Sequence, residues 1–137
     1  MAEIREDVVR QLIGTGKWGE GGQAHLGERA NYRCEYCDRD LLESADAYKL
    51  WQQDHIVPVE KGGNGDFENL ALACSLCNKS FKGKWDPRSR AGENASRPDL
   101  VSAVRAYVHE QRRRIEDELV TLRGIVGLDR QDPGSRT

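Results

Sequence analysis

The chain has 137 residues, a length that fits one domain with a single modest hydrophobic core. Its 21 basic and 23 acidic residues leave a net charge of -2, so the overall charge indicates neither a nucleic-acid nor a membrane partner. Apolar runs of only a few residues argue against a membrane-spanning helix, and the charged stretch MAEIREDVVRQL argues against a secretory leader. We therefore expect a cytoplasmic protein.

Residues 1–30 are expected to form a helical, glycine-rich extension. Apolar residues recur at helical spacing from residue 2 to residue 13, which predicts a short amphipathic helix. The segment GTGKWGEGGQ that follows holds too much glycine for regular structure. A second short helix is expected from about Ala24 to Asn31.

Four cysteines form two C-x-x-C pairs, Cys34 with Cys37 and Cys74 with Cys77. In a reducing compartment this arrangement favours metal ligation over disulfides. Each C-x-x-C turn can direct two sulfurs at one ion about 2.3 Å away, and two such turns complete a tetrahedral zinc site. The alternatives are a redox motif, which does not need a second copy, or four unrelated core cysteines.

The chain between and after the cysteine pairs predicts strand, loop, strand and helix within a core of residues 31–90. We expect a first strand over residues 48–57, although Gln52 and Gln53 weaken that expectation. The loop VEKGGNGDFE reverses the chain, and residues 69–74 can pair back as a second strand. The run NKSFKGKW predicts a helix that begins at the second cysteine pair.

The segment DPRSRAGENASRPDL predicts exposed turns, and a last helix is expected over residues 98–127. One apolar stripe follows this helix, formed by Leu100, Val104, Val108, Ile115, Leu119, Leu122 and Val126. Packing on the domain core is the favoured interpretation, and contact with a dimer partner or partner helix is the alternative. Residues 128–137 are expected to be disordered.

The order of motifs between the cysteine pairs is specific. From Asp54 the chain reads D-H-I-V-P, then Gly62-Gly63, Asn69-Leu70, and C-S-L-C-N ending at Asn78. Together with the first C-x-x-C pair, this resembles the zinc-stapled form of the HNH endonuclease family over roughly residues 34–84. The resemblance implies an α+β fold, with a small ββα-metal (HNH, His-Me finger) core stapled by a four-cysteine zinc site and flanked by N-terminal and C-terminal helices.

The same resemblance implies roles for individual residues. His55 is then the general base, and Asp54 and Asn78 are the ligands of a catalytic Mg²⁺ or Mn²⁺. Asn69 holds the hairpin loop so that His55 is aimed correctly. The structural zinc ligands are Cys34, Cys37, Cys74 and Cys77. Because Asn78 stands where the family often has histidine, the chain resembles an HNN variant, and the amide oxygen favours hard cations.

Phosphodiester hydrolysis explains why these residue types are needed. A neutral histidine can accept the proton of an attacking water near pH 7. A hard cation can bind the scissile phosphate and neutralise the leaving oxygen. Because Asp54 and His55 are neighbours on an expected strand, their side chains should point to opposite faces. Both can act on one phosphate if the loop bends locally, or if the metal lies on one side and the water on the other.

Local charge agrees with phosphate contact. Residues 74–90 carry five lysines and arginines against one aspartate, a net charge of +4. We therefore expect Lys79, Lys82 and Lys84 to contact DNA, and a solvated helix face is the alternative. The family often has lysine three residues after its last asparagine, whereas Phe81 occupies that place here and Lys82 follows.

These features predict a metal-dependent HNH endonuclease that nicks or cuts DNA by hydrolysis. The alternatives are a non-catalytic zinc-stapled module that binds nucleic acid or protein, and a nuclease subunit that needs a partner. A binding module needs only the cysteines and the basic segment, so it does not explain why all four remaining motif positions are occupied. The expected partners are DNA and either a second copy or a larger protein, with no membrane.

Overall fold

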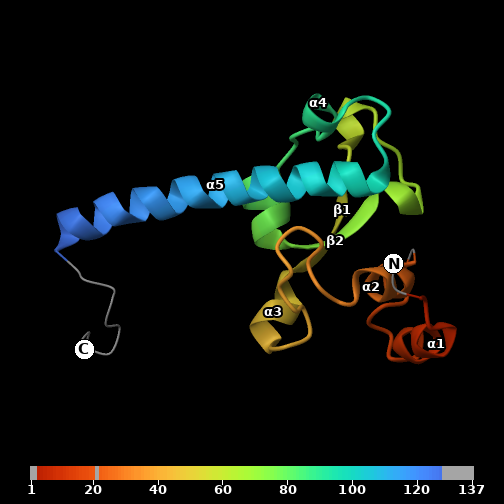
Figure 1. Cartoon of the computed structure of the whole chain (residues 1–137). Coiled ribbons are helices and arrows are strands. Elements are labelled where there is room, and N and C mark those ends of the chain that lie inside the picture. The colour runs from red at the N-terminus through yellow and green to blue at the C-terminus, as the bar shows by residue number, and fades with distance from the viewer. Residues whose placement is uncertain (1–2, 21, 128–137) are drawn as a thin grey trace.

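The computed structural model describes residues 3–20 and 22–127, so the tail expected to be disordered, residues 128–137, lies outside the described residues. The main elements in chain order are α1 (Glu6–Gly14), α2 (Gln23–Ala30), α3 (Ala45–Leu50), β1 (Trp51–His55), β2 (Leu70–Cys74), η3 (Leu76–Lys82), α4 (Arg88–Ala91) and α5 (Arg97–Val126). Two 3₁₀ turns, η1 (Val59–Lys61) and η2 (Phe67–Asn69), lie in the loop between the strands. The arrangement is the predicted α+β fold (Figure 1).

The two strands form an antiparallel hairpin that lies at the centre of the main core. Trp51 pairs with Cys74 at one end of the ladder, and His55 pairs with Leu70 at the other. Every residue of β2 is buried, because α2, α3 and η3 all pack against this strand. Its sequence Leu-Ala-Leu-Ala-Cys is apolar on both faces, as burial on two sides requires.

The first strand is shorter than the sequence predicts. Residues 48–50 belong to α3, a helix that the sequence analysis missed. The Ser44 hydroxyl accepts a hydrogen bond from the Ala47 backbone N–H at 3.0 Å and caps this helix. Residues 56 and 57 also lie outside β1, which ends at His55. A second short helix, α4, lies where only turns were expected.

The N-terminal helices form a second apolar cluster that joins the hairpin through aromatic stacking. Trp18 is buried, and its ring stacks on Trp51 of β1 with centroids 4.6 Å apart and planes 9° apart. Beside this stack, the buried Glu28 carboxylate accepts hydrogen bonds from Arg5 and from the Tyr32 hydroxyl. The Arg5 guanidinium lowers the pKa of Glu28 to about 2, so this carboxylate is ionised at neutral pH.

Helix α5 has two halves with different surroundings. Ser96 caps its first turn, and Val104 and Val108 are buried in the main core, where the helix packs against η3. At Arg112 the guanidinium lies over the Phe81 ring, 4.7 Å from its centroid. Beyond this residue α5 runs on away from the rest of the molecule (Figure 1).

The predicted packing of the α5 stripe on the core is therefore only half right. The first three members of the stripe are buried or partly buried, and the last four, Ile115, Leu119, Leu122 and Val126, are exposed. Periodicity identifies an apolar stripe, but it does not tell what covers the stripe.

No helix within residues 3–20 and 22–127 combines the length and the apolar content that crossing a membrane requires.

Candidate active site and zinc centre

The four cysteine sulfurs meet in one cluster. Their Sγ atoms all lie within 4.8 Å of one another, and the Cys37 and Cys74 sulfurs are 3.8 Å apart. A tetrahedral zinc site with bonds of about 2.3 Å has sulfur–sulfur edges of about 3.8 Å, so the spacing fits. The backbone N–H groups of Tyr36 and Cys77 donate to the sulfurs of Cys34 and Cys74 at 3.4 and 3.5 Å. This closed set of four sulfurs suits a structural zinc ion.

The cluster joins two parts of the chain that are distant in sequence. The first cysteine pair follows α2, and the second begins at the end of β2 and leads into η3. Glu35, inside the first pair, extends the edge of β2, because its N–H donates to Leu72 O and its carboxylate accepts from Leu72 N–H, both at 2.8 Å. The cysteine cluster therefore fixes where η3 leaves the hairpin.

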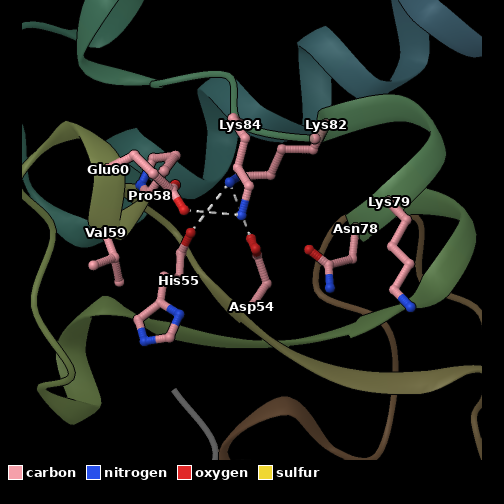
Figure 2. Close-up of a pocket in the computed structure, with 10 residues that line it drawn as sticks. Asp54, His55, Pro58, Val59, Glu60, Asn78, Lys79, Lys82 and Lys84 are labelled. Carbon is pink, nitrogen blue, oxygen red and sulfur yellow. Dashed lines mark hydrogen bonds and ion pairs between the residues drawn. The ribbon is translucent and has the colours of Figure 1, made fainter.

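A pocket of about 490 Å³ lies between the end of β1, the loop after it and η3. Figure 2 shows the side chains of the expected site around it. Among its lining residues are Asp54, His55, Asn78, Lys79, Lys82 and Lys84. The fold thus brings together the expected base, the expected metal ligands and the three expected DNA-contacting lysines.

Asp54 is a buried carboxylate held from two sides. Its Oδ2 accepts a hydrogen bond from the Tyr36 hydroxyl at 2.6 Å, and the Lys82 ammonium lies 3.2 Å from the same oxygen. Burial raises the pKa of Asp54 above its ordinary value, while the charge of Lys82 opposes that shift. Burial also raises the pKa of Tyr36 well above its ordinary value, so its hydroxyl keeps the proton that it donates.

Lys82 is a buried lysine, unlike the other two lysines expected to contact DNA. Only 2% of the residue is exposed, and its Nζ donates to the His55 carbonyl oxygen at 3.1 Å as well as pairing with Asp54. The reason is a π-helical turn: Gly83 N–H donates at 3.0 Å to the carbonyl of Asn78, five residues earlier. The wider turn directs Lys82 inward beneath the pocket.

Asn78 presents its amide oxygen to the pocket. Its Nδ2 donates to Gln52 Oε1 at 2.8 Å, which fixes the orientation of the amide. In Figure 2 the Asn78 oxygen lies on the side of Asp54. Sequence analysis missed both Gln52 and Tyr36 as parts of the site. For Gln52 a signal existed, because it precedes Asp54 by two residues and so shares its face of the strand.

His55 and Asp54 point in different directions, as expected for neighbours on a strand. The His55 imidazole turns away from the Asp54 carboxylate (Figure 2), yet both residues line the same pocket. His55 is the last residue of β1 and is partly exposed, so its ring reaches solvent at the pocket.

The loop after β1 is closed by Asn69, the last residue of η2, just before β2. Its Oδ1 accepts from Val57 N–H at 2.9 Å, and its Nδ2 donates to the carbonyls of Val57 and Asn64 at 3.1 and 2.7 Å. Gly63 packs so tightly here that an added Cβ would lie 1.8 Å from the Val57 oxygen. The Asn69 carbonyl oxygen accepts from Ile56 N–H at 2.8 Å, so Asn69 continues the hydrogen bonding of the hairpin just beyond β1 through both its backbone and its side chain.

The remaining two expected DNA-contacting lysines lie at the surface. Lys79 is exposed on η3. Lys84 lies 3.3 Å from a Glu60 oxygen, and both of these side chains are more than half exposed. An exposed pair of this kind contributes little to stability, so phosphate can compete for Lys84.

Comparison with known proteins agrees with this geometry. The family model described as HNH endonuclease matches residues 34–82, which span both cysteine pairs and the pocket. Residues 34–82 are an HNH endonuclease domain. Comparison with the curated proteins finds no match, and comparison with the solved structures finds none. Helices α1, α2 and α5 lie outside the HNH domain.

Loss of the zinc ligands should unfold the HNH domain. In small metal-stapled domains the free energy of metal binding is folding free energy, so Cys74→Ser should abolish the cooperative thermal transition at neutral pH. The purified wild-type protein should hold one zinc per chain by metal analysis. A Cys74→Ser protein that lacks zinc yet melts like the wild type would contradict the structural role of the cluster.

The contact between Gln52 and Asn78 predicts that Gln52 supports the binding of a hard cation. Because Gln52 orients the Asn78 amide, Gln52→Leu should weaken Mn²⁺ binding to the zinc-loaded protein by about tenfold or more in titration calorimetry. Gln53→Leu is the matched control, since Gln53 is exposed and lies on the other face of β1. Equal Mn²⁺ affinities for the two variants would show that Gln52 does not support a metal site.

Proposed function

We propose that this protein is a metal-dependent endonuclease that hydrolyses phosphodiester bonds in DNA, by nicking or by double-strand cleavage. The observation that carries the proposal is the single pocket that Asp54, His55 and Asn78 line together. Membership of residues 34–82 in the HNH endonuclease family implies a nucleic-acid substrate. The cytoplasmic location expected from the sequence is part of the same proposal.

Asp54 and Asn78 are the ligands that would hold a catalytic Mg²⁺ or Mn²⁺. A carboxylate and an amide oxygen are hard donors of the kind these cations take, and the other positions would be left to water and phosphate. The bound cation supplies charge stabilisation for the phosphate and the leaving oxygen. The contacts of Tyr36 and Gln52 support this assignment, since they orient the two donor groups.

His55 is the general base of the proposed reaction. Its imidazole takes a proton from the water that attacks phosphorus, while Asn69 holds the backbone just after it through Val57. The divergence of His55 from Asp54 supports separate roles, because it allows the base and the metal ligand to act on different sides of one phosphate.

Lys82 is proposed to position the site rather than to contact DNA. Its ammonium touches both Asp54 and the backbone of His55, so one side chain links the metal ligand to the base. The extra residue in the π-helical turn explains why this lysine follows Asn78 by four residues instead of the three common in the family. Lys79 and Lys84 lie at the surface, and these two lysines contact the phosphates of DNA in the proposed complex.

A zinc-stapled module that binds without cutting is the main competing function. Such a module needs the cysteine cluster and surface charge, but it has no use for a buried carboxylate with two dedicated partners. Burying an ion pair often costs more free energy than the pairing returns, and the pair of Asp54 with Lys82 lies in the wall of the pocket, so the arrangement around Asp54 favours catalysis. A nuclease subunit that a larger partner places on DNA has the same chemistry and differs in requiring that partner.

The test is cleavage of supercoiled plasmid by wild-type, His55→Ala and His109→Ala proteins, each with Mg²⁺, with Mn²⁺ and with EDTA. We expect metal-dependent nicking that falls about 10²- to 10⁴-fold in His55→Ala. His109 is the matched control, because it is an exposed histidine of α5 outside the motif, and its variant should cleave normally.

Zinc content and the melting curve must be unchanged in both variants for this comparison to hold. Normal cleavage by His55→Ala would remove the general-base assignment. DNA binding by the wild-type protein without cleavage of duplex, single-stranded or branched DNA in either metal would instead support the binding module.

A further inference from the structure

The projecting half of α5 carries an apolar seam with no covering in the described chain. Ile115, Leu119, Leu122 and Val126 are 46%, 41%, 46% and 64% exposed, and they recur at the alternating spacing of four and three residues. Soluble proteins seldom leave such a contiguous apolar row in water unless it binds something. The seam is about 17 Å long at 1.5 Å per helical residue.

The seam continues the same helix face that packs on the protein's own core. Val104 and Val108 lie on this face and are buried against the domain. A second helix running parallel along the seam would therefore collide with the core as it continued back past residue 112. An antiparallel helix avoids this collision, because its own domain then lies beyond the free end of α5.

We propose that residues 115–126 of α5 pair in antiparallel fashion with the same residues of a second copy of this chain. In that register Ile115 lies beside Val126 of the second copy, and Leu119 lies beside its Leu122. All four seam positions are then covered by apolar partners. The C-terminal end of each α5 lies beside the point near Arg112 where the α5 of the other copy extends beyond its own domain.

Charge complementarity argues for a second copy as the occupant. Glu116 and Arg123 immediately follow the seam residues Ile115 and Leu122 and so flank the seam on the same side of the helix. In an antiparallel pair, equivalent flanking positions face each other. Glu116 of each copy therefore lies near Arg123 of the other, which gives two opposite-charge pairs related by a two-fold axis.

The pairing is short, so it should be concentration-dependent. Two heptads are fewer than an independent coiled coil needs. The domain already holds the first half of α5 in helical form, so the second half does not have to nucleate its own helix. This inference does not depend on the nuclease proposal, because it concerns residues outside the HNH domain.

Sedimentation equilibrium of the full-length, zinc-loaded protein over a range of concentrations tests the inference. We expect a monomer–dimer equilibrium for the wild type and a dissociation constant raised by about tenfold or more in Leu119→Asp. Val120→Asp is the matched control, since Val120 is 61% exposed on the same half of α5 but lies off the seam. Its dimer should be as stable as the wild type.

The orientation is tested by exchanging the two flanking charges. Glu116→Arg and Arg123→Glu alone should each weaken the dimer, and the double exchange should restore it. A wild-type protein that stays monomeric at every concentration overturns the proposal, as does a dimer that Leu119→Asp leaves intact. A double exchange no better than the single changes overturns the antiparallel register. Zinc content and the melting curve verify that each variant is folded.

Discussion

The meeting of four sulfurs at one point is the constraint on which the rest of the HNH domain depends. Two five-residue strands and one wide helical turn cannot by themselves bury enough apolar surface to hold a fixed shape. The cysteine cluster ties the turn after α2 to the end of β2, and η3 starts from it. Because Asn78 and Lys82 lie on η3, the position of the pocket follows from the position of the cluster.

Two contacts connect this frame to the chemistry of the pocket. Tyr36 lies between the first two cysteines and donates to Asp54, so the same turn that supplies sulfur ligands also orients a pocket carboxylate. Lys82 completes the charge balance of that carboxylate from the opposite side. In this pair the Lys82 ammonium group compensates the buried negative charge of Asp54.

Much of the fold and site followed from the sequence, because spacing within motifs reports local geometry. The C-x-x-C turns and the hairpin are of this kind, whereas the convergence of Asp54, His55 and Asn78 was implied by the resemblance to the HNH family. The roles of Tyr36 and Gln52 were missed since each depends on a contact between residues distant in the chain. The burial of Lys82 was missed for a related reason, because it results from a π-helical turn that no sequence pattern predicted.

The errors in secondary structure also have physical causes. Residues 48–50 have strand-forming character, but the Ser44 cap and the burial of Ala47 favour helix there. For the apolar stripe of α5, packing on the core was the favoured interpretation and contact with a dimer partner or partner helix was the alternative. The core ends near Arg112, and α5 extends beyond it. The periodicity of apolar residues does not reveal where the core ends.

The most direct test of the account is to locate metal in crystals of the zinc-loaded protein grown with Mn²⁺, by anomalous diffraction at the edges of both metals. The account predicts zinc among the four cysteines and manganese bound by Asp54 and Asn78. Manganese at saturating concentration that binds elsewhere and leaves Asp54 and Asn78 without a metal would contradict the proposed catalytic centre.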